Sequence, residues 1–171
     1  MNRFVWLAAL GLALGAGCGY HMAGRGDALP KSFKTIAIPA FANATIAYHI
    51  TDRLSADITH EFLARTRYKV VTNPEAADAV LKGTVTKYYT AAATIDAVTN
   101  RNSTAGMSVT VLITLTDRAT GKVIYSRTIE GHDRYEISPS THTYFEESGA
   151  AQDRVARDLA KEIVTAILEK F

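Results

Sequence analysis

The sequence predicts an α/β fold of the α+β kind, a two-layer sandwich with two helices packed on one face of a mixed, mostly antiparallel, four- to five-stranded sheet. Two segments carry apolar residues at every fourth position, which is typical of helices with one buried stripe. Between them, apolar and polar residues alternate over long stretches, which indicates strands with one buried face. Stacking the helices on that face is the simplest way to bury both surfaces.

The first half of the chain is expected to supply a strand, a helix and a short second strand. Residues 35–41 form the first strand, which ends soon after Pro39 because proline has no N–H to donate to a ladder. Residues 48–65 form the first helix, and residues 68–71 form a short strand that stops before a proline. The apolar stripe of this helix consists of Ile50, Leu54, Ile58 and Phe62.

The second half is expected to supply the long strands. Residues 79–94 form one strand, and the polar residues 95–105 form a loop. The clearest strand spans residues 107–116, in which apolar side chains at odd positions face one way and hydroxyl side chains mostly face the other. A hairpin connection at 117–122 contains Gly121 and leads to a return strand.

The return strand spans residues 123–135, a loop at 137–147 follows it, and an amphipathic helix at 149–171 closes the chain. Ser148 is the expected N-cap of this helix. Its buried stripe consists of Val155, Leu159, Ile163 and Ile167. The sheet face opposite the helices is rich in threonine and tyrosine, so it is either wetted by solvent or a binding surface.

Composition limits the classes of function. A chain of 171 residues supports one ordinary domain, and 47% hydrophobic with 21% charged residues is a globular balance. The net charge of +2 is too small to predict nucleic-acid binding, and no basic stripe is interleaved with aromatic residues. We therefore expect no nucleic-acid partner.

The N-terminus has the layout of an export signal. A short positive segment precedes the apolar residues 4–14, and Gly15, Ala16 and Gly17 supply the small side chains that a signal peptidase needs. Cys18, the one cysteine of the chain, follows directly, which is the pattern of a bacterial lipoprotein whose thiol is acylated before cleavage. A membrane anchor of this kind is stable because more than one acyl chain is attached.

This pattern divides the chain into a lipoprotein signal peptide at 1–17, a lipidated Cys18 with a flexible tether at 18–34, and a single globular α/β domain at 35–171. Lipoprotein signals usually place leucine three residues before the cysteine, and here Gly15 stands there instead. The alternative is an ordinary signal peptide in which Cys18 has no special role.

Catalytic and metal-binding motifs are missing from the sequence. It contains no Gly-x-Ser-x-Gly elbow, no His-Glu-x-x-His helix and no phosphate-binding glycine loop. His132 and Asp133 stand near Ser138, but a catalytic triad is defined by geometry rather than by proximity in sequence. We expect no enzyme activity, no cofactor and no metal site.

Three basic residues are candidates for binding an anionic lipid. Lys87 lies on the long strand, Arg101 lies in the following loop, and Arg134 lies on the last strand. Adjacent antiparallel strands bring the 95–105 and 136–147 loops to one end of the sheet, where these cations are expected to gather and bind lipid phosphates through charge-assisted hydrogen bonds. The alternative is ordinary solvated charge.

The order of several segments resembles the LptE family of lipopolysaccharide-assembly lipoproteins. The resemblance extends over nearly the whole mature chain, and no single segment is diagnostic. It rests on Cys18-Gly19-Tyr20-His21, on KTIAIPAFAN at 34–43, RTRYKVV at 65–71 and ADAVLKG at 77–83, and on residues 29–30 and 146–171.

The resemblance implies a lipid-anchored, periplasm-facing protein of the outer membrane that plugs the lumen of the lipopolysaccharide translocon barrel LptD. It also implies that the protein helps this barrel to fold and binds lipopolysaccharide. Gly19 rather than aspartate after the cysteine is similar to Gram-negative lipoproteins that are sorted to the outer membrane. The family has no crisp lipid-binding motif, so the three basic candidates rest on charge and topology.

A second resemblance leaves an alternative function open. Residues 36–43 followed by a helix are also similar to the start of periplasmic domains that activate cell-wall synthases or build secretion pores. In that case the protein is a lipid-anchored regulator or a pore subunit. The long segment at 79–135 and the closing helix fit the barrel plug better.

Overall fold

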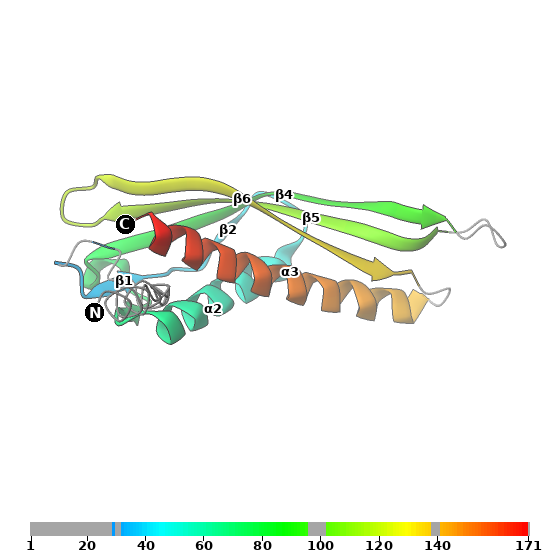
Figure 1. Cartoon of the computed structure of the whole chain (residues 1–171), viewed down its shortest axis with the longest axis horizontal. Helices are drawn as coiled ribbons and strands as arrows, with labels where there is room; N and C mark the ends of the chain where they lie inside the picture. The colour runs from blue at the N-terminus through cyan, green and yellow to red at the C-terminus, as the bar shows by residue number, and fades with distance from the viewer. Residues whose placement is uncertain (1–28, 30–31, 96–101, 138–140, 171) are drawn as a thin grey trace, which may run out of the picture.

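The computed structural model describes residues 29, 32–95, 102–137 and 141–170. Two α-helices and a mixed sheet confirm the predicted α+β class, and both helices lie on the same side of the sheet (Figure 1). The elements in chain order are β1 (Thr35–Ala37), β2 (Ala42–Asn43), α2 (Tyr48–Arg65), β3 (Lys69–Val71), the 3₁₀ helix η2 (Pro74–Ala76), β4 (Ala79–Ile95), β5 (Asn102–Asp117), β6 (Val123–Glu136) and α3 (Thr141–Glu169).

The sheet has six strands in the order β3-β1-β4-β5-β6, with β2 also paired to β4. The short strands β1, β2 and β3 pair in parallel, whereas β4, β5 and β6 form an antiparallel meander. The prediction of four to five strands was wrong because a further short strand, β2, follows the segment expected to form the first strand. β1 ends at Ala37, and after Pro39 the chain returns to the sheet as β2, which pairs with β4 at Thr84 and Val85.

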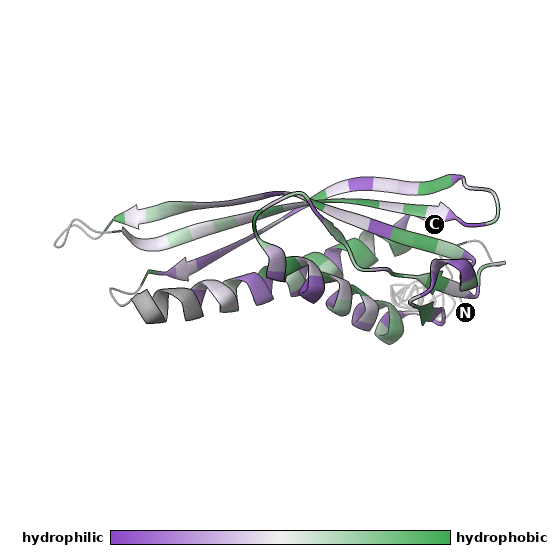
Figure 2. Ribbon diagram, turned by 180° about the vertical axis from the view of Figure 1, so that it is seen from behind, coloured by the Kyte–Doolittle hydropathy of each residue, from purple (hydrophilic) through white to green (hydrophobic). Residues whose placement is uncertain are grey.

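The core lies between the sheet and the two helices. Both predicted helix stripes and the odd-numbered apolar residues of β5 are buried in one cluster. Figure 2 shows the hydrophobic and hydrophilic bands that alternate along the strands and around the helices. The core of α2 and β5 consists of Ile50, Leu54, Ile58, Phe62, Val109, Val111, Ile113 and Leu115, each 0% exposed.

Helix α3 begins earlier than the sequence predicted. It starts at Thr141, so most of the expected 137–147 loop is helical, and Ser148 lies inside the helix rather than at its N-cap. Among the side chains of α3 whose burial is described, Ala151 is the first buried one. The sequence at 141–150 has no apolar residue at every fourth position, which is why periodicity missed the first turns. In a similar way β5 starts at Asn102, so the second half of the expected 95–105 loop is strand.

Asp78 ties the first strand to the start of β4. Its Oδ2 accepts hydrogen bonds from the backbone N–H groups of Lys34, at 2.8 Å, and Thr35, at 3.0 Å. The Thr35 hydroxyl donates to the same oxygen at 2.9 Å. These bonds, with that from the Lys34 N–H the largest effect, hold the pKa of Asp78 below its ordinary value. At the start of β1, the carboxylate therefore takes the place of a backbone carbonyl as the acceptor for two N–H groups.

Packing extends into the segment that the sequence assigns to the tether. Leu29 is 2% exposed and belongs to the main core. Its backbone N–H donates to the Tyr68 hydroxyl at 3.3 Å. The ordered domain thus includes a residue six positions before β1. Within the described residues, neither helix combines the length and apolar character needed to cross a membrane.

Candidate functional site

A bulge in β4 determines which side chains face away from the helices. Val85 pairs with Val111 and is buried, but the register shifts between Val85 and Lys87. After the shift, Lys87 and Tyr89 lie on the sheet face opposite the helices, which we call the outer face. The bulge therefore sends a cation and an aromatic ring to a face that no helix of the described chain covers.

Beyond the bulge, the outer face is hollowed. The hollow has a volume of about 650 Å³. Its floor is made of small residues, because Gly106 of β5 pairs with Ala91 of β4 on one side and with Arg134 of β6 on the other. A Cβ placed on Gly106 would meet only the Ala91 carbonyl oxygen, at 4.0 Å. The residues that line the hollow are Tyr89, Ala91, Ala92, Ala93, Gly106, Met107, Ser108, His132, Asp133 and Arg134.

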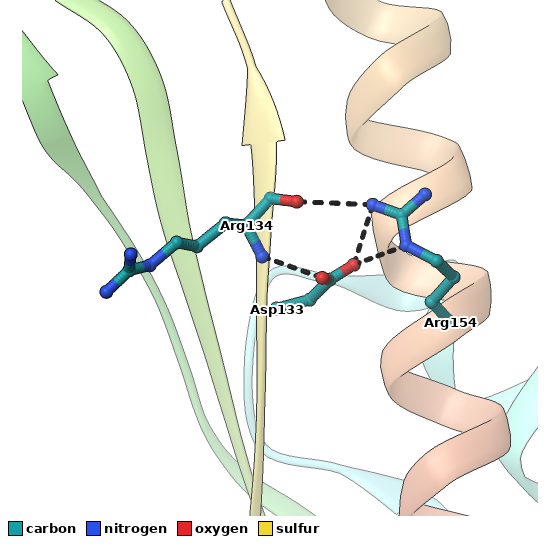
Figure 3. A network of polar contacts seen from close by, with 3 residues as sticks. All are labelled: Asp133, Arg134 and Arg154. Atoms are coloured by element: carbon teal, nitrogen blue, oxygen red, sulfur yellow. Dashed lines mark hydrogen bonds and ion pairs between the residues drawn. The ribbon is translucent and has the colours of Figure 1, made fainter.

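Arg154 of α3 fixes the backbone of β6 beside the hollow (Figure 3). Asp133 points toward α3, where its Oδ2 accepts from Arg154 Nε at 2.7 Å. The Arg154 Nη2 donates to the backbone carbonyl of Arg134 at 3.3 Å, and the Arg134 N–H donates to Asp133 Oδ1 at 2.7 Å. The Arg134 side chain points to the opposite side, away from α3. The backbone at Arg134 is thus fixed while its guanidinium reaches the outer face.

Two basic side chains, His132 and Arg134, line the edge of the hollow. His132 Nε2 lies 3.9 Å from Glu130 Oε1, and the Ser108 hydroxyl donates to the same oxygen at 2.5 Å. Arg134 has no carboxylate partner for its guanidinium within the described part of the chain. Arg134 is therefore the cation beside the hollow that is available to an anionic ligand.

The structure separates two of the predicted basic residues. Lys87 aligns with Thr110 and through it with Glu130, whereas Arg134 aligns with Gly106. Both lie on the outer face, but they are four register positions apart, which is about 13 Å along the strands. The expectation that Lys87 gathers with Arg134 at the end of the sheet is not met. Arg101 lies outside the described residues, as does Cys18.

Within the described residues, His132 and Asp133 are not arranged as a catalytic pair. His132 and Asp133 are neighbours in β6, so their side chains lie on opposite faces of the sheet. Asp133 is engaged by Arg154, and Ser138 lies outside the described residues. Among the residues that the structure describes, no three His, Cys, Asp or Glu side chains are grouped to hold a metal ion.

Sequence reasoning missed Tyr89, Ala91, Gly106 and His132 as parts of the site. Small residues in a strand carry no signal of their own, and the hollow exists only because they stand opposite one another in adjacent strands. The strand register, which the sequence does not fix, is therefore the missing information. The one available hint was the Thr- and Tyr-rich face that the alternation predicted.

The fold and this site define a small two-layer α+β domain with an uncovered sheet face. The same fold occurs in lipoprotein B from Nitrosomonas europaea, an uncharacterised lipoprotein, with a TM-score of 0.60 and 15% identity over 88% of this chain and 91% of that one. Rare lipoprotein B from Shewanella oneidensis gives a TM-score of 0.53 and 12% identity over 77% and 93%. The PelC dodecamer subunit from Paraburkholderia phytofirmans gives a TM-score of 0.53 and 18% identity over 84% of this chain and 93% of that one.

These identities establish a shared fold and nothing further. No curated protein matches the sequence. The sequence model of the LptE family, described as lipopolysaccharide-assembly, matches residues 33–167 and so covers most of the chain. The chain therefore belongs to the LptE family of lipopolysaccharide-assembly lipoproteins, which confirms the resemblance found in the sequence.

Proposed function

We propose that this protein is an outer-membrane lipoprotein that plugs the lipopolysaccharide translocon barrel LptD, assists its assembly and binds lipopolysaccharide during insertion into the outer leaflet. The observation that carries the proposal is the match to the LptE family over residues 33–167. The protein acts by binding and not by catalysis. Its membrane attachment is a lipid on Cys18, at the end of the signal peptide.

The outer face supports the lipid-binding part of the proposal. Lipopolysaccharide carries phosphate groups next to acyl chains, so a site for it needs a cation beside an apolar surface. Arg134 supplies a guanidinium, which bonds phosphate oxygens in a bidentate manner, and the hollow beside it has a floor of alanine and glycine. Lys87, farther along the same face, and Arg101 remain proposed contacts for other anionic groups.

The polarity of the outer face supports the proposal that the domain fills the lumen of a barrel. Large membrane barrels have polar interiors, so a domain that fills one needs a polar exterior. Thr84, Thr110, Thr114 and Ser126 lie on the outer face and are partly or fully exposed, with Leu112 the large apolar exception, 40% exposed. A lipid at Cys18 would raise the local concentration of the domain at the barrel.

The experiment is an affinity purification of the tagged, lipidated protein from detergent-solubilised outer membranes, with partners identified by mass spectrometry. A stoichiometric, heat-modifiable β-barrel is the expected partner. A peptidoglycan synthase, or a ring of identical subunits without a barrel, would instead assign the protein to the class of cell-wall activators or secretion-pore subunits. The control is the same purification from membranes freed of peptidoglycan, because it removes proteins that co-purify only through attachment to the cell wall.

A further inference from the structure

Strand β4 has a partner on only one edge over its second half. Along its length it pairs with β5, whereas on the other edge β1 pairs only at Ala79 and Val80, and β2 only at Thr84 and Val85. Among the described residues, no strand pairs with that other edge from Tyr89 to Ile95. We call this stretch the open edge of β4. It presents a row of backbone N–H and C=O groups to its surroundings.

The open edge lacks charge and proline, two features that usually protect an exposed strand, although its register with β5 shifts between Ala92 and Thr94 and again between Thr94 and Ile95. Its sequence, YTAAATI, contains neither proline nor a charged residue, and Tyr89 and Ile95 are 66% and 63% exposed. The edge strand β6 is different, because it carries Arg127, Glu130 and Arg134 and has α3 packed beside it. The third edge, β3, is only three residues long. Among the described strands, the open edge is therefore the long edge that neither charge, proline nor a helix protects.

The chemistry of the open edge restricts what can occupy it. Successive N–H and C=O groups along a strand are matched only by another extended backbone, so the occupant is a polypeptide strand rather than a lipid or a helix. Seven residues span about 23 Å at roughly 3.3 Å each. Such a pairing buries well under the total of about 1,200 Å² that a stable independent dimer needs. A second copy of this chain is thus a poor occupant, since nothing else would hold it there.

We propose that the open edge of β4 receives an extended loop segment of the barrel partner as an added strand. This inference rests on the proposed function, because a barrel that encloses the domain supplies the segment at high local concentration. The strands of a closed barrel wall have no unpaired edges to offer. The segment therefore comes from a loop that folds into the lumen. Because Ala91, Ala92 and Ala93 are small, that loop can approach the sheet closely.

An added strand would also complete the lipid site. Tyr89, Ala91 and Ala93 line the hollow, so alternate side chains of the added strand would form a further wall beside them. The barrel segment and the lipid would then share one surface. Pairing of the loop and occupation of the hollow are expected to depend on each other.

Photocrosslinking in intact outer membranes tests the position of the segment. The full-length, lipidated chain carries p-benzoylphenylalanine at Ala92 or at Ala93, and at the exposed Ala64 of α2 as the control. Adducts from both edge positions are expected to map to a single short loop peptide of the barrel, while Ala64 gives no adduct with that peptide. Adducts with a second copy of this chain, or with scattered barrel-wall strands, overturn the proposal.

A proline scan tests the backbone pairing itself. Successive residues of a strand point their N–H groups alternately toward β5 and toward the open edge, so Thr90→Pro, Ala91→Pro and Ala92→Pro should fall into two classes. Proline at an outward N–H is expected to lower barrel co-purification about tenfold and leave the urea midpoint of the domain near that of the wild type. Proline at an inward N–H is expected to lower the urea midpoint.

The two proposals fail in different ways. If the wild-type chain captures no barrel, the plug function is wrong and the added strand falls with it. If the wild type captures the barrel and no proline variant separates binding from stability, the plug stands and the added strand is wrong.

Discussion

Arg154 on α3 and Asp133 on β6 form an ion pair in which both Nε and Nη2 lie 2.7 Å from the same carboxylate oxygen. The pair joins the last strand, β6, to the last helix, α3 (Figure 3). Because the same guanidinium also binds the Arg134 carbonyl, the contact fixes the backbone that carries the proposed lipid-binding cation.

A double-mutant cycle of Asp133→Ala and Arg154→Ala is expected to give a coupling free energy of about 1 kcal/mol in urea unfolding. The value is modest because the Arg154 side chain is 47% and the Asp133 side chain 23% exposed, so water screens the charges. High salt should reduce it further. Additive single variants at low salt would show that the pair contributes no stability.

Substitution by alanine is expected to destabilise the protein at Gly83 but not at Gly106. The Phe41 ring covers Gly83, and a Cβ there would overlap its ring atoms, so Gly83→Ala should lower the free energy of unfolding by about 1–3 kcal/mol. Gly106→Ala makes only an ordinary contact with the Ala91 carbonyl oxygen, at 4.0 Å, and serves as the matched control, with a change expected within about 0.5 kcal/mol. Urea denaturation followed by circular dichroism measures both. Equal losses would contradict the packing of Phe41 on Gly83.

The sequence was sufficient for the parts of the fold that depend on a regular period. The stripe of α2 and the alternation of β5 place their apolar residues in the core as predicted, because a helix period of 3.6 and a strand period of 2 leave little choice of face. The helix bounds at Tyr48 and Arg65 also agree with the prediction.

The predictions that failed concern places where the regular helix or strand period is interrupted or where strand pairing decides the outcome. The bulge between Val85 and Lys87 has no marker in the sequence, yet it decides which of the following side chains reach the outer face. The first turns of α3 lack a regular apolar stripe, and Gly149, a poor helix former, stands between them and the buried stripe, so no sequence signal indicated them. The hollow required the pairing of Ala91 with Gly106, which is a property of register.

Asp78 predicts a loss of stability in acid. Its pKa is lower in the folded protein than its ordinary value of 3.8, so the carboxylate favours folding above that pH, and this contribution is lost as the pH falls through the folded pKa. The wild type should therefore lose stability below about pH 4. Asp78→Asn is expected to be less stable at pH 7 and to show a smaller decrease between pH 4 and pH 2. A parallel decrease in both proteins would contradict this role.

Cys18 and Gly19 make separate predictions about the membrane anchor. Cys18→Ala should abolish incorporation of labelled palmitate and release the protein from membranes, because acyl chains provide the attachment. Gly19→Asp should keep the label and shift the protein from the outer to the inner membrane fraction in a density gradient. Unchanged detergent-phase partitioning of Cys18→Ala would eliminate the lipoprotein assignment.

Arg134 and Lys87 are expected to contribute unequally to lipopolysaccharide binding. Arg134→Glu should weaken binding about tenfold, since a charge-assisted contact beside an apolar surface is worth about 1.5–3 kcal/mol and one substitution removes it. Lys87→Glu alone should have a smaller effect, because Lys87 lies four register positions away from Arg134. Combining Lys87→Glu with a charge reversal at Arg101 should weaken binding more. The measurement is a titration of the purified variants with fluorescent lipopolysaccharide.

Lys122→Glu provides the matched control, because Lys122 is exposed in the hairpin at the opposite end of β5 and its reversal changes the net charge equally. If overall charge governs binding, Lys122→Glu will weaken it as much as Arg134→Glu. If the hollow is the site, Gly106→Leu, which places an apolar side chain over its floor, will weaken binding without any change in charge. Native circular dichroism in all variants ensures that the loss concerns the outer face and not the fold.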